Sequence, residues 1–532
     1  MAGFPLRTLF VTLGLWCAPA LAAPDTVSDA LAAALQASVV HCGTARLDRQ
    51  RLVPYYAEMA PLWVSERGAG ARAQRLHTTL QNAGQEGLPV TRYRIADIEA
   101  HWPANTPAEQ ACLDLLLTAG FDRYSRDVRR GLTSQHEADP SWQLRPPPFD
   151  PVATLHAAST DSDLTRLLES LPPAHTAYVR LRTALARYRQ LAEQGDWSPL
   201  PAGPKLAPGD EHEQVTLLRD RLRSEGDLPR LAPSFGTRYD APLAAAVENF
   251  QRRHGLHADG IVGTRTRAAL NVPAAERAAQ LRRAMERLRW LPRDFGSHYI
   301  LANTAGFELA VVEEGKTLLR MRTINGTPDQ ATPSFTATLQ SLIINPYWYV
   351  PERIARQRLW PRAQANPGHL PARGFRVFDT RNGAWQELDP ARLDWERING
   401  NGSGMRLRQD PGPGNLMGRL SFVFPNPFDV FLHDTPERAL FERDTRTFSE
   451  GCVRIENAMA LALHTLRRMP EWTAARIQAE IDALHHQTLS LPEPIPVYVL
   501  YLPSWVADDG QVHFRDDVYR REPVLASYYP AN

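Results

Sequence analysis

Residues 431–458 read FLHDTPERALFERDTRTFSEGCVRIENA. The apolar residues that precede His433 predict a β-strand that ends at this histidine. The apolar run that begins near Ile455 to Asn457 predicts a helix. Cys452 lies between the two predicted elements, directly after Gly451 and one loop beyond the histidine. A strand, a loop with Gly-Cys and a helix therefore frame a cysteine and a histidine that can meet.

A cysteine attacks carbonyl groups as its thiolate, and an unperturbed thiol has a pKa of roughly 8.5. A neighbouring imidazole or a helix N-terminus can activate it. Cys452 has both within reach in the sequence, because His433 ends a rigid strand and the predicted helix follows closely. Backbone N–H groups around Gly451 and Cys452 could stabilise an oxyanion. The residues predict a cysteine acyl-transfer site, with a buried structural cysteine and a core histidine as the alternative.

The N-terminus predicts export. Arg7 precedes an apolar run from Leu9 to Leu21 that ends in the small-x-small sequence ALA, as in a secretory signal peptide over residues 1–22. A lipoprotein would use Cys17, but the bulky Trp16 stands where a small residue is expected. The mature protein is expected in the periplasm.

Composition limits the possible partners and cofactors. The chain has 532 residues, 43% of them hydrophobic, and a formal net charge of +1. Without long basic runs, nucleic acid is not an expected partner. No later stretch has the roughly 18 apolar residues of a membrane span. No CxxC, HxxxH or HExxH spacing occurs, so a zinc site is not expected.

The hydrophobic periodicity changes along the chain and predicts an α+β multidomain protein. Helical spacing continues through 24–197, and a Pro/Gly-rich linker then opens a unit of three short helices at 198–275. Alternating strand patterns begin near residue 297 and predict a mostly β domain at 297–503, with hairpin turns at Gly306 and at Glu314-Gly315. This domain contains a less regular insertion at 353–418. A hairpin with its turn at Asp509-Gly510 and a tail follow at 504–532.

The three-helix unit resembles the peptidoglycan-binding module of wall enzymes. The matching sequences are AVENFQRRHGL and DGIVGTRTRAALN, the second at Asp259–Asn271. A new helix is expected after Gly263. A plain helical bundle is the alternative, and such modules do not all bind glycan.

The pattern HDTP…FSEGCVR resembles the signature of the YkuD-type L,D-transpeptidases, His-x(n)-Ser-x-Gly-Cys-x-Arg. The sequences NPYWYVP, ARGFRV and DPGPGNLMGRLSF are similar to the large, multidomain YcbB-like branch, as is the N-terminal CLDLLLTAGFDRYSRDV. The resemblance implies a mostly β YkuD-like catalytic domain, a capping insertion over its groove and a helical scaffold.

The resemblance also assigns roles. Cys452 is the implied nucleophile and His433 the implied proton acceptor, whose third partner in this family is usually a backbone carbonyl, so Asp434 is not assumed to be a triad aspartate. Trp348 either lines the pocket or packs in a core. Arg454 braces the loop or meets a substrate carboxylate. The implied site residues are Cys452, His433, Gly451, Arg454, Ser449, Asp434, Thr435, Trp348 and Phe431.

Two residues depart from the family pattern. Glu450 stands beside the nucleophile, where relatives often have an uncharged residue, and a carboxylate facing the sulfur would disfavour the thiolate. It would have to point to solvent or pair with an arginine such as Arg443 or Arg446. Phe431 stands where close relatives often have tyrosine.

The implied activity is a periplasmic L,D-transpeptidase that forms 3→3 cross-links between peptidoglycan stem tetrapeptides through a Cys452 thioester. Carbapenems are implied inhibitors, and other wall-synthesis enzymes are possible partners. A cysteine L,D-carboxypeptidase and a non-catalytic wall-binding protein are the alternatives. The acceptor remains open among another stem, a free D-amino acid, a lipoprotein lysine and water.

The exported protein would keep three cysteines in an oxidising compartment, which predicts one disulfide and one free thiol. With Cys452 as the nucleophile, the expected pair is Cys42 and Cys112.

Overall fold

The structure is a computed structural model that describes residues 25–58, 60–158, 160–229, 236–395 and 404–529. The predicted signal peptide, 1–22, and Cys17 lie outside these described residues. The chain divides into two compact units. Unit 1 comprises residues up to Gln81, Val90–Tyr124 and Pro151–Leu168, and unit 2 comprises Asn82–Pro89, Ser125–Asp150 and the chain from Glu169 onward. None of the helices in the described segments has the length and apolarity that a membrane span needs.

Unit 1 is mainly helical and is built on α5 (Pro107–Arg130), whose residues up to Tyr124 belong to it. Inside it, the fully buried Asp114 accepts hydrogen bonds from the backbone N–H of Trp63 at 2.7 Å and of Val64 at 2.9 Å. The Tyr56 hydroxyl donates to the same carboxylate at 2.6 Å. A buried carboxylate with this many donors fixes the preceding loop on α5. The other elements are α1 (Val27–Gln36), β1 (Val40–Cys42), β2 (Ala45–Leu47), α2 (Arg49–Leu52), β3 (Val64–Ser65), β4 (Gly68–Ala69), α3 (Ala71–Gln81), α4 (Ile95–Ala100), α7 (Pro151–Ala157) and α8 (Asp161–Ser170).

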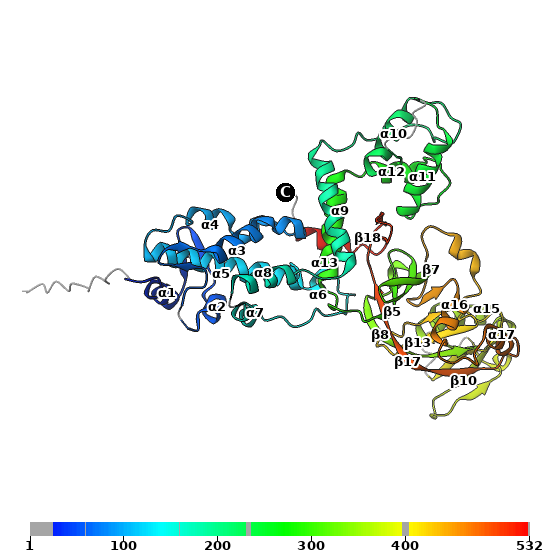
Figure 1. Cartoon of the computed structure of the whole chain (residues 1–532). Coiled ribbons are helices and arrows are strands. Elements are labelled where there is room, and N and C mark those ends of the chain that lie inside the picture. Colours follow the sequence, from blue (N-terminus) through cyan, green and yellow to red (C-terminus); the bar gives the residue numbers. More distant parts are fainter. Residues whose placement is uncertain (1–24, 59, 159, 230–235, 396–403, 530–532) are drawn as a thin grey trace, which may run out of the picture. The chain divides into compact units, whose positions relative to one another are not determined.

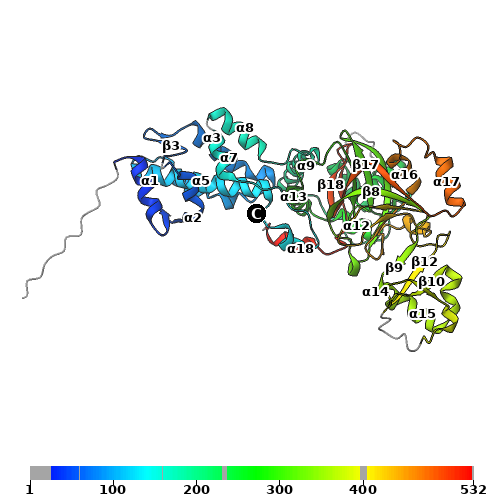
Figure 2. The ribbon, with the colours of Figure 1, turned by 90° about the horizontal axis from the view of Figure 1, so that it is seen from below.

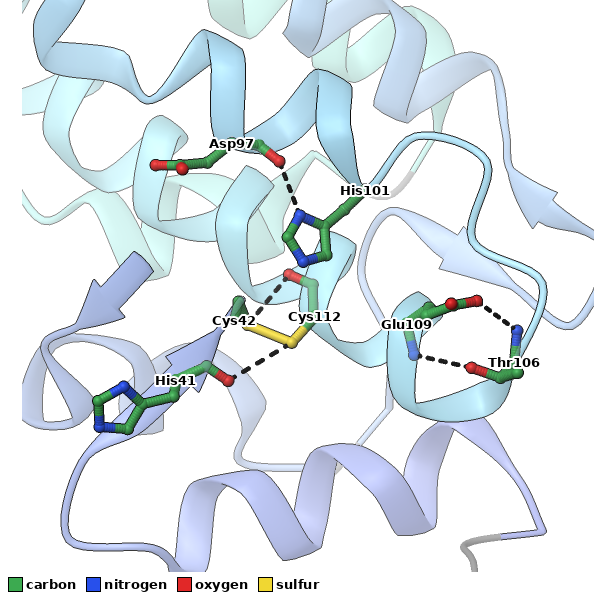
Figure 3. The surroundings of a disulfide bond; sticks show 7 residues. All are labelled: His41, Cys42, Asp97, His101, Thr106, Glu109 and Cys112. Atoms are coloured by element: carbon green, nitrogen blue, oxygen red, sulfur yellow. Dashed lines mark hydrogen bonds between the residues drawn. A yellow bond between two sulfur atoms is a disulfide. The ribbon is translucent and has the colours of Figure 1, made fainter. Parts of the chain in front are cut away.

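A disulfide joins the end of β1 to the first half of α5. Cys42 and Cys112, which are 70 positions apart in sequence, are bonded, with Cα atoms 5.3 Å apart (Figure 3). Each sulfur also lies 3.6 Å from a carbonyl oxygen, that of Cys112 and that of His41 respectively. The predicted pairing is confirmed, and Cys452 is a free cysteine.

Unit 2 begins with helices and includes the predicted three-helix unit, formed by α10 (Gln214–Glu225), α11 (Ala241–Arg253) and α12 (Thr264–Leu270) (Figure 1). Its own core contains Leu218, Val247 and Phe250. Gln251 organises the turn before α12, because its side chain bonds the backbone N–H of Gly260 and the Asp259 carboxylate, both at 2.9 Å. The helix start predicted after Gly263 is confirmed.

Two long helices, α9 (Thr176–Glu193) and α13 (Ala274–Arg289), share a second core with the hairpin of β18 (Ser504–Val506) and β19 (Val512–Phe514). The hairpin turn at Asp509–Gly510 is the predicted one. The tail continues into α18 (Glu522–Ser527), a short helix that the sequence reading did not predict. The remaining helix of this region is α6 (Gln135–Ala138).

The β domain is a closed barrel. The sheet order is β15-β7-β16-β14-β13-β8-β17-β5-β6, and β6 also pairs with β7, so the sheet returns on itself with β15 attached outside the ring. Closure removes the unpaired edges that would invite association. The strands are β5 (His298–Asn303), β6 (Glu308–Glu313), β7 (Lys316–Gly326), β8 (Phe335–Ile344), β13 (Leu420–Val423), β14 (Leu432–His433), β15 (Thr447–Ser449), β16 (Val453–Ile455) and β17 (Gln487–Leu500).

The barrel core is completed by two helices that follow the cysteine. Leu461 of α16 (Ala458–Thr465) and Ile477 of α17 (Ala474–Asp482) belong to the same buried cluster as Leu342, Leu432 and Val453. The hairpin turns predicted at Gly306 and at Glu314-Gly315 join β5 to β6 and β6 to β7.

The insertion is a separate layer with its own core. Its sheet has the order β11-β10-β12-β9, from β9 (Trp348–Val350), β10 (Phe375–Asp379), β11 (Gln386–Leu388) and β12 (Met405–Gln409). Residues including Ile354, Leu359 and Phe375 form a cluster distinct from the barrel core. Figure 2 shows these strands grouped with α14 (Glu352–Ile354) and α15 (Trp360–Ala365), apart from β8 and β17. The predicted α+β multidomain fold class is confirmed.

Removing the disulfide should destabilise the helical scaffold. In the chain-entropy view, closing a loop of this length destabilises the unfolded chain by about 4 kcal/mol. The Cys42→Ala/Cys112→Ala protein should therefore unfold at a lower temperature than the wild type, and Cys452→Ser, the matched control, should not. Equal thermal unfolding of the two variants would contradict the stabilising role.

Candidate active site

The site is positioned by a short parallel pairing between β14 and β16. Leu432 pairs with Val453 and His433 pairs with Arg454. Leu432 and Val453 are fully buried in the barrel core. Successive side chains of a strand alternate between faces, so His433 and Arg454 lie on the opposite face. Cys452, one residue before β16, shares that face by the same alternation.

His433 is held as a neutral, oriented imidazole. It is 4% exposed, and its Nδ1 forms a hydrogen bond with the backbone carbonyl of Asp434 at 2.6 Å. Burial lowers the pKa of His433 to about 3, the positive charge of Arg454 acts in the same direction, and the carbonyls of Asp434 and Met417 oppose it. The ring is therefore uncharged at neutral pH and can accept a proton.

The Asp434 carboxylate has other partners. It accepts a hydrogen bond from the backbone N–H of Arg419 at 3.0 Å and forms an ion pair with Arg438. Gly418 makes this close approach possible, because a Cβ there would lie 2.5 Å from Asp434. The histidine is thus oriented by a carbonyl rather than by a carboxylate.

Cys452 is a half-buried thiol. Its Sγ donates to the backbone carbonyl of Asp429 across 3.7 Å. Burial raises the pKa of Cys452, whereas the backbone N–H of Phe431 and the charge of Arg454 lower it. Burial dominates, so the resting pair is a neutral thiol and a neutral imidazole. Proton transfer must then accompany attack on a substrate.

The loop before the cysteine is held by hydroxyl groups. Ser449 Oγ donates to the Cys452 carbonyl at 2.5 Å and accepts from the Gly451 N–H at 3.2 Å. Thr332, which is fully buried, donates to the Gly451 carbonyl at 2.9 Å. Gly451 has φ +118°, a conformation that other residues rarely adopt. Since its N–H is bound to Ser449, Gly451 contributes loop geometry rather than a free N–H donor.

Arg454 braces the opposite loop. Its guanidinium pairs with the Glu437 carboxylate and is only 12% exposed. The same charge influences both His433 and Cys452, so Arg454 lies close to each of them. A positive group at this place favours the thiolate that forms during attack and keeps the imidazole neutral beforehand.

Two expectations about the surroundings of the cysteine are wrong. The helix starts near the predicted place, at Ala458 directly after its N-cap Asn457, but β16 lies between it and Cys452. The partial positive charge of a helix terminus falls off within its first turn, so α16 does not act directly on the sulfur.

The second error concerns the partners of Glu450. Its carboxylate pairs with Arg353 and Arg358 of the insertion, not with Arg443 or Arg446. The guanidinium of Arg446 instead donates to the backbone carbonyls of Thr323 and Phe307, both at 3.0 Å. Pairing with an arginine was the correct alternative, but the arginines lie nearly 100 residues earlier in the chain.

The remaining predicted residues lie in two places, beside His433 and in the insertion. Phe431 and Thr435 flank the histidine, and Thr435 Oγ1 caps the following turn by accepting from the Glu437 N–H at 3.2 Å. Trp348 belongs to the insertion sheet, where it pairs with Gln409 and its ring centroid lies 5.9 Å from that of Phe375. These contacts are those of core packing, and no contact found in the described residues joins Trp348 to Cys452.

Sequence reasoning missed Thr332 and Asp429, which hold the nucleophile loop and the thiol. Neither belongs to a recognisable pattern, although Asp429 has φ +52°, as a tight turn before β14 requires. Within the described segments, no cluster of three or more His, Cys, Asp or Glu side chains could hold a metal ion. The site consists of a thiol, an imidazole and the loops that fix them.

The protonation states predict the pH dependence of Cys452 reactivity. Because burial raises the pKa of Cys452, its rate of alkylation by iodoacetamide should still increase above pH 9. A free thiol titrates with a midpoint near roughly pH 8.5. The neutral imidazole is lost only as the pH falls through about 3, so no protonation of His433 should appear between pH 5 and 8. Mass spectrometry of the Cys452 peptide gives the rates. A plateau that begins below pH 7 would instead indicate a preformed thiolate–imidazolium pair.

Comparison with known proteins agrees with this site. Residues 297–472 match the family profile "L,D-transpeptidase catalytic domain" of the YkuD family. Residues 211–270 match "Putative peptidoglycan binding domain" and residues 50–185 match "Scaffold domain". A Haemophilus influenzae protein named "Putative L,D-transpeptidase" is 31% identical over 234 residues, which are 44% of this chain and 46% of that protein. The match thus spans under half of the relative's length.

Solved structures with detectable similarity include L,D-transpeptidases. The enzyme from Stackebrandtia nassauensis is 13% identical, with 57% of this chain and 97% of that chain covered and a TM-score of 0.21. The enzyme from Xylanimonas cellulosilytica is 15% identical, with 56% and 99% covered and a TM-score of 0.18. At such TM-scores these superpositions carry no argument. The YcbB-like branch stays a prediction, but the profile matches identify the domains: residues 297–472 form a YkuD-type L,D-transpeptidase catalytic domain, in one chain with a scaffold domain and a peptidoglycan-binding domain.

Proposed function

We propose that this protein is a periplasmic L,D-transpeptidase that forms 3→3 cross-links between peptidoglycan stem peptides through a thioester on Cys452. The observation that supports the proposal is the shared face of β14 and β16: His433 lies opposite Arg454 in the register, and strand alternation puts Cys452 on the same face, within residues that match an L,D-transpeptidase catalytic domain. The neutral state of both groups supports general-base activation of the thiol at the moment of attack.

In the first half-reaction, the substrate is a stem tetrapeptide. Cys452 Sγ attacks the carbonyl carbon of the amide between the L-centre of the third, diamino-acid residue and the terminal D-alanine. The thiol proton passes to His433, which returns it to the departing amine. The C–N bond breaks, D-alanine leaves, and a C–S thioester bond remains on the enzyme.

In the second half-reaction, the side-chain amine of a diamino acid in a neighbouring stem attacks the thioester. His433 takes a proton from this amine and returns it to the sulfur as the C–S bond breaks. The product is an amide between two third residues, and the free thiol is regenerated. No oxidant, metal or nucleotide enters this balance.

The loop at 449–452 would stabilise the oxyanion of each tetrahedral intermediate. Because the Gly451 N–H donates to Ser449, we assign the oxyanion role to the Cys452 N–H. Thr332 and Ser449 hold this loop before the substrate binds, which limits the reorganisation needed during reaction.

The other domains support a wall substrate. The match of residues 211–270 to a peptidoglycan-binding domain suggests docking of the chain on the polymer. The insertion at 353–418 would cover the substrate groove as a lid. The predicted signal peptide at 1–22 would deliver the protein to the periplasm.

Substitution of the nucleophile and of the base should separate their roles. Cys452→Ala should abolish acyl-enzyme and cross-link formation, and His433→Ala should lower the rate by about 10²–10⁴-fold. Muropeptides from wall that carries tetrapeptide stems, analysed by mass spectrometry after incubation, give the products. Cross-linking by the Cys452→Ala protein would exclude the mechanism.

The same experiment distinguishes the acceptor. Release of D-alanine with tripeptide stems and no cross-link would identify water as the acceptor, and the protein would then be an L,D-carboxypeptidase. Arg468→Ala, which alters an exposed ion pair with Glu493 on the barrel surface, is a suitable control because it should leave the product pattern unchanged.

A thiol that attacks amides should also open a β-lactam, whose strained ring resembles an activated acyl group. We expect a carbapenem to form a lasting adduct on Cys452. The adduct lasts if the resulting thioester fits beneath the insertion and resists water. Intact-mass spectrometry of the folded protein should show one adduct, and none in Cys452→Ser. The absence of an adduct on the wild-type protein, with its thiol reduced, would count against the family reaction.

A further inference from the structure

Glu450 joins the nucleophile loop to the insertion. It precedes Gly451 and Cys452 directly, and its carboxylate is bound from two sides. Arg353 Nη2 lies 2.5 Å from one oxygen and Arg358 Nη2 lies 2.5 Å from the other. The carboxylate side chain is 17% exposed, so each oxygen faces a guanidinium rather than bulk water.

The two arginines meet one carboxylate because of a local departure from the α-helix. In an α-helix, residues five apart are about 140° apart around the axis. Here α14 passes into a π-helical turn at Ala355–Leu359, whose hydrogen bonds join residues five apart. That spacing brings Arg353 and Arg358 toward the same side. Pro361 follows in the first turn of α15, and its missing N–H and bulky ring disfavour regular α-helix just before it.

The arginines belong to the root of the insertion. α14 follows β9 directly, and Ile354 and Leu359, which adjoin the two arginines, are buried in the insertion core. On the other side, Glu450 lies within the loop that Ser449 and Thr332 hold rigid. The ion pairs therefore connect two ordered bodies rather than two mobile side chains.

The charge balance gives this connection a second effect. An unpaired carboxylate next to the sulfur would raise the cost of forming a thiolate. Two guanidinium groups compensate that charge while leaving the carboxylate in place as a bridge. Loss of both arginines would thus release the insertion and leave an unpaired carboxylate on the loop that carries Cys452.

We propose that Glu450, Arg353 and Arg358 form a latch that fixes the root of the insertion against the nucleophile loop, and that Glu450 is a positioning residue for the stem peptide. The latch itself follows from the geometry. Its effect on substrate rests on the proposed function: a fixed insertion orders the stem peptide at Cys452 and excludes water from the thioester.

Hydrogen exchange tests the latch without any substrate. In the full-length protein, amides of residues 352–365 should exchange roughly five-fold faster or more in Glu450→Gln and in Arg353→Ala/Arg358→Ala, a change in the range expected for partly exposed ion pairs. Combining Glu450→Gln with Arg353→Ala and Arg358→Ala should raise the exchange rate little further, because all three residues belong to one interaction. Arg356→Ala is the matched control, since Arg356 is exposed on the same turn and has no ion pair in the part of the chain that the structure describes. Unchanged exchange in the latch variants, or an equal increase in Arg356→Ala, would overturn the proposal.

Steady-state kinetics test the positioning role. In the latch variants, KM for a soluble stem tetrapeptide should rise about ten-fold, and the ratio of hydrolysis to cross-linking should increase. Arg353→Lys/Arg358→Lys should restore much of both properties, because the charges remain. Faster exchange with unchanged KM and product ratio would overturn the positioning role. If the wild-type protein acts on no stem peptide, the proposed function fails, while hydrogen exchange still decides the latch.

Discussion

The catalytic arrangement depends on the register between β14 and β16. Leu432 opposite Val453 and His433 opposite Arg454 put two apolar side chains into the barrel core and two functional ones on the other face. A shift of the pairing register by one residue would turn every side chain of one strand to the opposite face. It would bury an arginine or a second polar group among Leu342, Ile344 and Phe422. The hydrophobic core therefore fixes which face of the two strands carries the imidazole and the thiol.

The barrel surroundings also set the protonation states. Burial keeps His433 neutral and raises the pKa of Cys452, so the site does not store a thiolate. Arg454 offsets part of that effect at the sulfur. A neutral thiol is a weaker nucleophile than a thiolate, so this arrangement makes Cys452 less susceptible to oxidation and to adventitious electrophiles. The disulfide of the scaffold engages the only other described cysteines.

Ser449, Thr332 and Glu450 act on the same short loop from different sides. The two hydroxyls bind its backbone carbonyls, and the carboxylate reaches the insertion. A Gly at 451 is favoured by its positive φ, and the buried Thr332 hydroxyl donates to its carbonyl. The contacts that fix the backbone beside Cys452 and the ion pairs to the insertion thus meet within residues 449–452.

The sequence by itself determined the fold class, the hairpin turns, the three-helix unit and the cysteine–histidine pair, because these are encoded by local periodicity, turn residues and spacing. The choice of Cys42 and Cys112 as the bonded pair also followed, from the number of cysteines. Tertiary structure alone decided the rest. The partners of Glu450, the role of Thr332, the strand between Cys452 and α16 and the packing of Trp348 on Phe375 depend on segments distant in sequence. No local pattern specifies such contacts, because they form only when barrel closure and insertion packing bring those segments together.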